Sequence, residues 1–212
     1  MSNRSNGGRG GLSRRGFLKG GVVTAAGAAI GDASLEALAQ EQGKPAGARV
    51  ISGTTKVTLN VNGKDRQLEI EPRTTLADAL RDRADLTGTK VVCDRGSCSA
   101  CTVFVNNVLT LSCLSLAIDA QGKKIKTIEG VADGDKLHPV QEQFIEHDAM
   151  QCGFCTPGMI MSCVALLEQN KQPTVDDVKQ ATCGNLCRCG TYPKVFSATL
   201  AAAKQMSTNQ NA

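Results

Sequence analysis

The sequence predicts an α+β unit followed by an all-helical unit, and three observations support this fold class. Residues 56–70 alternate polar and apolar side chains around an Asn-Gly pair, which is typical of two strands joined by a tight turn. From residue 138 onward the apolar side chains recur at helical spacing. Most of the ten cysteines fall into two sets, one in each part of the chain. We therefore expect two units, each with its own cysteine site.

The first unit begins with a predicted hairpin and a helix. Strands are expected at Lys56–Val61 and Gln67–Ile70, with the turn at Asn62-Gly63. Thr75 can cap a helix over Leu76–Arg83, of which one face is apolar. That face consists of Leu76, Ala79 and Leu80.

Three more strands complete the first unit. A second hairpin is expected to join Thr102–Val105 to Val108–Leu111 across Asn106-Asn107. Ile125–Ile128 is the predicted closing strand. These elements give a sheet wrapped around one helix.

The second unit is expected to contain four helices. Pro139 suits the first position of a helix, and Pro157 opens a second helix. Thr174–Asp177 resembles a capping box for the third, and Pro193 precedes a final helix that ends near Gln205. The buried face of the first helix is predicted to be Val140, Phe144 and Ile145.

The cysteines of the first unit have the spacing C-x4-C-x2-C-x11-C. They are Cys93, Cys98, Cys101 and Cys113. The first three follow the plant-type iron–sulfur pattern, in which four thiolates hold two irons. Three ligands on one loop can wrap a cluster, and Gly96 can adopt a positive φ where that loop turns inward. Backbone N–H groups of the loop can then point at the cluster sulfurs.

The cysteines of the second unit have the spacing C-x2-C-x31-C-x-C. They are Cys152, Cys155, Cys187 and Cys189. A disulfide framework or a zinc site is the alternative for either set. Zinc sites usually combine C-x2-C with another such pair or with histidines, and this chain has two histidines. The spacings favour iron–sulfur clusters, and two clusters in one short chain indicate electron transfer.

The N-terminus has the features of an export signal. Ser13–Lys19 contains a twin-arginine pattern, Gly20–Ile30 is mildly apolar, and Ala37–Ala39 offers a small-x-small cleavage site. The apolar stretch is too short and too weak to span a membrane. A disordered basic tail is the alternative. Twin-arginine export carries folded proteins, so clusters inserted in the cytoplasm could cross already buried.

Composition argues against a nucleic-acid partner. Residues 40–212 carry 19 basic and 18 acidic residues, and the chain has one tyrosine and no tryptophan. Neither a basic surface nor a set of aromatic stacking residues is therefore present.

Five stretches around the two cysteine sets carry a family resemblance. They are Gly88–Cys93, Cys98–Val103, Ile128–Gly130, Gln151–Met159 and Gly184–Tyr192. On these residues the chain resembles the iron–sulfur subunit of the xanthine oxidase family of molybdenum hydroxylases. The resemblance runs from about Lys56 to Lys204. It implies an N-terminal β-grasp domain of the plant-type ferredoxin fold, followed by an all-α four-helix domain that binds a second [2Fe–2S] cluster.

The resemblance also implies partners and cofactors. The expected partners are a molybdopterin-binding large subunit, with a cytosine dinucleotide form of the cofactor, and an FAD-binding medium subunit. Electrons would pass from molybdenum to the helical-domain cluster, then to the β-grasp cluster, then to FAD. Gln151 matches a position that contacts the pterin. No residue of this subunit is expected to be catalytic, and no membrane span is expected.

The chain departs from the family pattern in three places. Relatives usually have glycine where Val92 and Ser99 stand beside the first and second ligands. The second set ends in Cys189-Gly-Thr-Tyr192 instead of the commoner Cys-Thr-Gly-Tyr. This order also resembles the periplasmic aldehyde-oxidising and isoquinoline-oxidising branches.

The remaining cysteines and both histidines are not expected to be cluster ligands. Cys163 and Cys183 are both expected to be buried thiols, although Cys183 could be mistaken for a ligand. His138 and His147 are expected to be surface or capping residues, because both ligand sets are complete without them. Arg188 has two interpretations, a residue that biases the cluster electrostatically and a solvated surface residue.

The expected organisation follows from these patterns. The segments are a twin-arginine signal peptide at 1–39, a linker at 40–54, the β-grasp domain at 55–132, the helical domain at 136–205 and a flexible tail at 206–212. The predicted function is electron transfer in an exported, periplasmic molybdenum-dependent aldehyde oxidoreductase. The alternatives are the same role in an N-heterocycle hydroxylase, a free two-cluster carrier, or a structural zinc or disulfide module.

Overall fold

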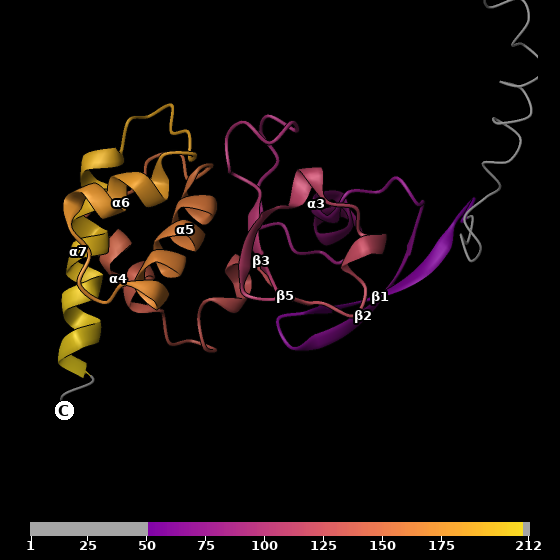
Figure 1. The fold of residues 1–212 in the computed structure, drawn as a ribbon, viewed down its shortest axis with the longest axis horizontal. Helices are drawn as coiled ribbons and strands as arrows, with labels where there is room; N and C mark the ends of the chain where they lie inside the picture. Colours follow the sequence, from indigo (N-terminus) through magenta and orange to yellow (C-terminus); the bar gives the residue numbers. More distant parts are fainter. Residues whose placement is uncertain (1–50, 210–212) are drawn as a thin grey trace, which may run out of the picture. The chain divides into compact units, whose positions relative to one another are not determined.

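The structure, a computed structural model, describes residues 51–209. The predicted signal peptide, its cleavage site, most of the linker and the last three residues lie outside the described residues. The chain from Ile51 onward forms one compact unit. It contains a five-stranded sheet followed by a group of helices (Figure 1).

The sheet is mixed, with the strand order β2-β1-β5-β3-β4. Its strands are β1 (Thr55–Val61), β2 (Lys64–Ile70), β3 (Thr102–Val105), β4 (Val108–Leu111) and β5 (Lys124–Lys126). The β1–β5 pair is parallel and the other pairs are antiparallel. Together with the helix after β2, this arrangement confirms the predicted ferredoxin-like unit.

Both predicted hairpins are confirmed. Asn62 and Gly63 have φ values of 52° and 75° between β1 and β2. Asn106 and Asn107 have φ values of 49° and 64° between β3 and β4. Two consecutive left-handed residues match the right-handed twist of the strands, and asparagine and glycine adopt that conformation most readily.

The predicted helix after β2 is present in a modified form. The Thr75 hydroxyl accepts the N–H of Asp78 at 3.1 Å and caps α3 (Leu76–Asp78), as predicted. The chain then continues as a wider π-helical turn over Ala79–Arg83. All three residues of the predicted apolar face are fully buried.

The closing strand is shorter than predicted. Strand β5 ends at Lys126, and Ile128–Gly130 forms a 3₁₀ turn. The Asn62 side chain ends the ladder, because its Oδ1 accepts the N–H of Thr127 and its Nδ2 donates to the Thr127 hydroxyl, both at 2.9 Å. Strand propensity depends on neighbouring residues and cannot predict a contact between residues 65 positions apart.

Four helices form the second part of the unit. They are α4 (Pro139–Glu146), α5 (Thr156–Gln169), α6 (Val175–Thr182) and α7 (Tyr192–Asn209). The predicted capping box before α6 is confirmed by reciprocal hydrogen bonds between Thr174 and Asp177. Helix α7 extends beyond its predicted end at Gln205. Across residues 51–209, no helix combines the length and apolar composition that crossing a membrane requires.

One predicted core position in α4 is wrong. Val140 and Phe144 are buried, but Ile145 is 64% exposed. Ile145 follows Phe144 directly, so the helix turns it about 100° away from the buried face.

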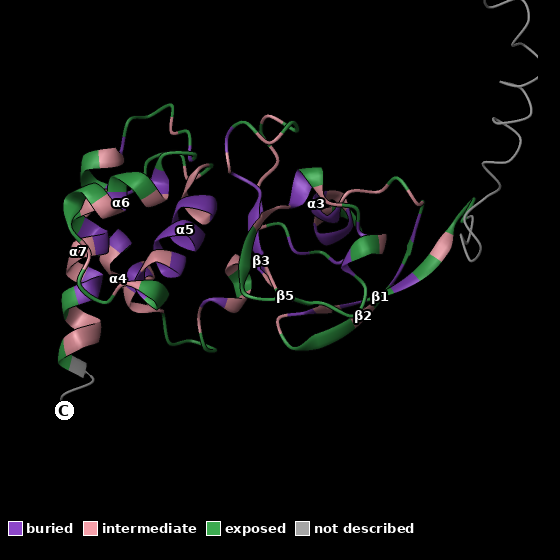
Figure 2. Ribbon diagram, viewed as in Figure 1, coloured by how far each residue is buried: buried purple, intermediate pink, exposed green. Residues whose placement is uncertain are grey.

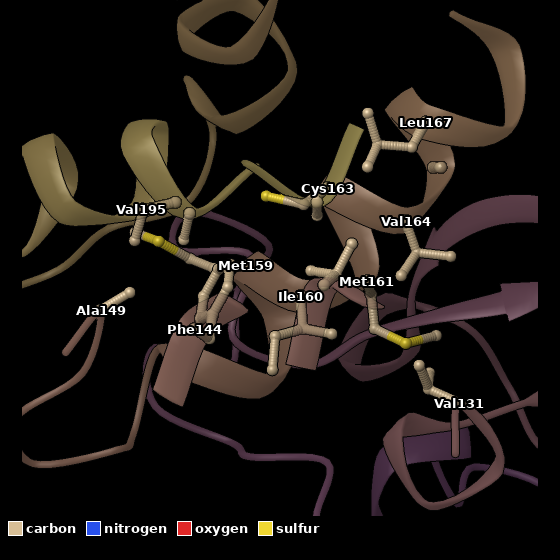
Figure 3. Close-up of a cluster of buried hydrophobic side chains, with 14 of the residues drawn as sticks. Val131, Phe144, Ala149, Met159, Ile160, Met161, Cys163, Val164, Leu167 and Val195 are labelled. Atoms are coloured by element: carbon tan, nitrogen blue, oxygen red, sulfur yellow. The ribbon is translucent and has the colours of Figure 1, made fainter. Parts of the chain in front are cut away.

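Helix α5 is the centre of the helical core. Its residues from Gly158 to Ala165 are buried around the whole helix (Figure 2). Figure 3 shows Met159, Cys163 and other α5 side chains packed among residues of neighbouring helices. Strand β3 joins the two cores, because Val103 belongs to the sheet's core while Phe104 belongs to the helical core. The two parts therefore pack directly on one another.

Candidate functional site

The first cysteine set lies around the loop that precedes β3. Cys93, Cys98 and Cys101 are on this loop, and Cys113 is in a 3₁₀ turn (Ser112–Leu114) directly after β4. Cys93 is half-buried and the other three are buried. The hairpin β3–β4 thus returns the fourth cysteine to the loop that carries the first three.

The loop backbone turns its N–H groups toward sulfur. Asp94, Gly96 and Ser99 all have left-handed φ values, of 51°, 72° and 53°. The N–H of Ser97 donates to Cys93 Sγ at 3.2 Å. The backbone N–H of Gly96 lies near the Cys113 sulfur and acts to lower the pKa of that thiol. Such donors stabilise negative charge on sulfur, which is what a cluster requires of its surroundings.

The backbone conformation is what favours glycine at position 96, because a left-handed φ is costly for other residues. A Cβ at this position would lie 2.4 Å from Leu114 Cδ1, but the Leu114 side chain is 63% exposed and can move aside. The sequence-based expectation of a positive φ at Gly96 is confirmed.

The four thiols of the first set come together in two pairs. Cys93 and Cys98 form one pair and Cys101 and Cys113 form the other. The N–H of Arg95, followed by the Cys98 thiol, lowers the pKa of Cys93 to about 7. Burial, followed by the neighbouring Cys101, raises the pKa of Cys113 to about 11. A two-iron cluster takes two thiolates on each iron, so this pairing suits it.

The second cysteine set lies between the ends of three helices. Cys152 and Cys155 precede α5, and Cys187 and Cys189 are in the loop between α6 and α7. Cys155 and Cys187 are half-buried and close enough to shift each other's pKa, whereas the other two cysteines are exposed. Cys152 lies close enough to Cys155 to influence its charge. The structure thus pairs Cys155 with Cys187 and places Cys152 near them, whereas Cys189 lies exposed on the same loop as Cys187.

The Cys155–Cys187 pair has unequal pKa values. Burial, followed by the Cys187 neighbour, raises the pKa of Cys155 to about 12. Burial also disfavours the Cys187 thiolate, but hydrogen bonds from Thr191, Cys155 and Gly190 together outweigh it and lower the pKa to about 7. The sulfur of Cys187 is therefore the one that its surroundings prepare to carry negative charge.

Three residues around Cys187 hold its loop in place. The Tyr192 hydroxyl accepts the N–H of Cys187 at 2.8 Å and donates to the carbonyl of Asn185 at 3.0 Å. The Thr191 hydroxyl lies 3.3 Å from Cys187 Sγ. Sequence reasoning did not assign roles to these residues, although they lie within the Gly184–Tyr192 stretch that carries the resemblance.

Within residues 51–209, no three Cys, His, Asp or Glu side chains lie close enough to hold a single metal ion. The thiols are arranged in pairs instead. The chemistry of the donors, four cysteines in each set with amide donors around the sulfurs, fits a two-iron cluster in each place.

The two cysteine sites are joined directly. The N–H of Leu186, the residue before Cys187, donates to the carbonyl of Cys98 at 3.1 Å. Asn185 is buried, and its side chain donates to the Ser99 carbonyl at 3.3 Å. A cavity of about 480 Å³ is lined by cysteines of both sets, among them Cys93, Cys98, Cys155 and Cys187. Two redox centres at these sites would therefore be neighbours.

The structure also places the other glutamine, cysteine, histidine and arginine residues that the sequence analysis discussed. Gln151 is exposed beside Cys152. Cys163 is a buried core thiol, as predicted, and its Sγ lies 3.1 Å from the Thr199 hydroxyl. His138 caps the N-terminus of α4 and His147 its C-terminus, which confirms the capping interpretation. Arg188 is exposed.

The prediction that Cys183 is buried is wrong. Cys183 is the C-cap residue of α6 and is exposed. The preceding residue, Thr182, is buried instead. Its hydroxyl donates to the Val178 carbonyl inside the helix, which satisfies the buried polar group.

Fold and site together define a two-domain iron–sulfur protein for electron transfer. Residues 59–123 match the family described as 2Fe-2S iron-sulfur cluster binding domain, and residues 127–200 match the [2Fe-2S] binding domain family. The chain belongs to the iron–sulfur subunits of the xanthine oxidase family of molybdenum hydroxylases. In such oxidoreductases it is a non-catalytic, electron-transferring subunit.

Relatives and solved structures agree with this family. The chain is 41% identical to the iron-sulfur-binding subunit of an aldehyde oxidoreductase from Escherichia coli O157:H7, over 93% of this chain and 90% of the relative. It is 44% identical to the small subunit of nicotine 6-hydroxylase from Paenarthrobacter nicotinovorans, over 76% and 96%. Quinoline 2-oxidoreductase from Pseudomonas putida 86 is 41% identical with a TM-score of 0.71, over 74% of this chain and 98% of the matched chain.

The export prediction is also confirmed. Residues 11–31 match the family of twin-arginine translocation signal sequences. The chain is therefore exported to the periplasm by the twin-arginine pathway.

Proposed function

We propose that each cysteine set holds one [2Fe–2S] cluster through four thiolates. The β-grasp ligands are Cys93, Cys98, Cys101 and Cys113, and the helical-domain ligands are Cys152, Cys155, Cys187 and Cys189. The paired thiols of the first set and the Cys155–Cys187 pair support this assignment. When bound, each cluster supplies a one-electron redox centre.

Electrons enter at the helical-domain cluster and leave from the β-grasp cluster. The single observation that carries this route is the hydrogen bond from the Leu186 N–H to the Cys98 carbonyl, which joins the two ligand loops. Gln151 and Cys189 are exposed, so a pterin on a molybdenum subunit could reach them. Leu114, beside Cys113, is 63% exposed and leaves an apolar surface next to the first cluster for an FAD subunit.

The complete enzyme oxidises aldehydes to carboxylic acids in the periplasm. The aldehyde oxidoreductase relative from Escherichia coli aligns with 93% of this chain, whereas the nicotine 6-hydroxylase relative aligns with 76%. The molybdenum partner carries the cofactor as a cytosine dinucleotide, and a medium-sized partner carries FAD. N-heterocycle hydroxylation is the second candidate, favoured by the 98% coverage of a quinoline 2-oxidoreductase chain.

The domain division follows the two sites. We place the β-grasp domain at 55–132, after a linker at 40–54, and the helical domain at 136–209, because α7 continues through the first residues of the predicted tail. The signal peptide is removed after Ala39, and the mature protein begins at Gln40.

Purification of the complex through an affinity tag on this chain tests the proposal. The expected preparation contains molybdenum, FAD and four irons per copy of this chain, with two distinct reducible signals by electron paramagnetic resonance. Aldehydes should then reduce both clusters faster than N-heterocycles do. A stable preparation that lacks molybdenum would contradict the complex, and one signal in place of two would contradict the ligand assignment.

A further inference from the structure

The side chain of Thr191 is buried against a cluster ligand. Thr191 is 3% exposed, and its Oγ1 lies 3.3 Å from Cys187 Sγ. A buried hydroxyl requires a hydrogen-bond partner, and this sulfur is the partner that the structure provides. A thiolate that ligates iron has no proton to donate, so in the loaded protein the hydroxyl is the donor.

The surrounding backbone holds Thr191 in this position. Its carbonyl accepts the N–H groups of Lys194 and Val195 at 3.1 and 3.0 Å, which anchors the residue at the start of α7. Tyr192, the next residue, binds the backbone of the Cys187 loop through its hydroxyl. The Cys187 sulfur and the Thr191 hydroxyl are therefore held in position relative to each other by hydrogen bonds at both ends of the segment that joins them.

The order of residues 190 and 191 determines which of them reaches the sulfur. Gly190 has a φ of 77°, and a Cβ at this position would meet nothing within 4 Å. Position 190 thus faces open space, whereas position 191 faces the ligand. In the commoner order Cys-Thr-Gly-Tyr the hydroxyl would stand at the open position, so the Gly-Thr order of this chain is what brings it to the ligand.

We propose that Thr191 is a positioning residue that sets the reduction potential of the helical-domain cluster. This inference rests on the proposed binding of that cluster by Cys187. Reduction adds one electron, and hence one negative charge, to the cluster and its thiolates; the same electron later leaves to the β-grasp cluster. An O–H donor on a ligand sulfur stabilises the reduced form more than the oxidised form, because the reduced form carries more negative charge.

The expected effect is large enough to measure. Loss of the donor should shift the ratio of reduced to oxidised helical-domain cluster about tenfold at a fixed potential, which corresponds to about 59 mV for one electron. The direction is toward a lower potential. The β-grasp cluster should keep its potential and serves as an internal reference.

The test is a redox titration of the purified holo-complex, monitored by electron paramagnetic resonance. Three variants are compared with the wild type: Thr191→Val, Thr191→Ser and Thr199→Val. Thr199 is the matched control, because it is also a buried threonine whose hydroxyl lies close to a sulfur, 3.1 Å from that of the non-ligand Cys163. Thr191→Ser keeps the hydroxyl while removing the methyl group.

The expected result is a lower potential of one cluster in Thr191→Val, restored in Thr191→Ser and unchanged in Thr199→Val. If Thr191→Val does not retain its cluster, Thr191→Ala is compared with Thr191→Ser in the same way. The inference is overturned if the potential is unchanged in the hydroxyl-free variants, or if Thr199→Val shifts it equally. Failure of the proposed function would look different, because the wild-type complex itself would then lack a second reducible signal.

Discussion

Gly158 lies where helix α5 meets the loop that carries the first cysteine set. This glycine lies near the start of α5, and a Cβ built on it would be 2.2 Å from the Ser99 carbonyl oxygen and 3.1 Å from Ala100 Cα. Both contacts are to backbone of the loop that carries the first cysteine set. Because backbone atoms cannot rotate away, Gly158→Ala would force α5 and this loop apart by about 1 Å to reach ordinary contact distances.

Two opposing effects decide whether this substitution raises or lowers the free energy of unfolding. Alanine in place of glycine inside a helix stabilises by about 1 kcal/mol. Overpacking of a well-filled contact costs about 1–3 kcal/mol, and the upper end applies where the neighbour is rigid backbone. We therefore expect a net destabilisation of about 2 kcal/mol, which corresponds to a fall of roughly 4–8 °C in the melting temperature of a unit this size.

The assay is thermal unfolding of the holo-protein, followed through loss of the visible absorption of the clusters. Gly184→Ala is the matched control, because its Cβ would lie 3.1 Å from the same residue, Ser99, but from the hydroxyl oxygen of its side chain. That side chain can rotate, so the control should melt close to the wild type. A Gly158→Ala protein that melts at or above the wild-type temperature would refute the reasoning, because the helix preference of alanine would then be unopposed.

Three further predictions follow from single residues. Ser99→Gly should raise the free energy of unfolding by up to about 1 kcal/mol in denaturant titrations, because Ser99 has a φ of 53°; a loss of stability would contradict this. Burial, followed by the positive charge of Lys126, lowers the pKa of His138, which caps α4 by accepting the Val140 N–H. The stability that the neutral His138 cap contributes should therefore be complete above the unfolded pKa near 6.5. It should be lost as the pH falls through the lower pKa of the folded state. His138→Asn keeps a capping acceptor and should lose this pH dependence, and an unchanged pH profile in that variant would reject the assignment. Cys183→Ser should retain all of its iron and stay within about 0.5 kcal/mol of wild-type stability, because Cys183 is exposed; loss of one cluster's iron would make Cys183 a ligand.

The hairpin turns and helix starts were readable from the sequence because each depends on neighbouring residues. Asn62-Gly63 adopts a left-handed turn, and Thr75 and Thr174 cap helices through residues three positions away. The spacing of the cysteines likewise identified the type of site, since ligand spacing reflects how a loop wraps a cluster. The family followed from the residues around those cysteines.

Features that depend on contacts between distant residues needed the tertiary structure. The early end of β5 is caused by Asn62, and the exposure of Cys183 results from where α6 stops. The closeness of the two sites depends on Leu186 meeting Cys98 and on the absence of a side chain at Gly158. No local pattern encodes such contacts, because side chains far apart in the chain meet only when the helices pack on the sheet. Local residue patterns thus predict the elements, the kind of cofactor and the family, whereas the packing of α5 on the loop of the first cysteine set establishes how the two sites are joined.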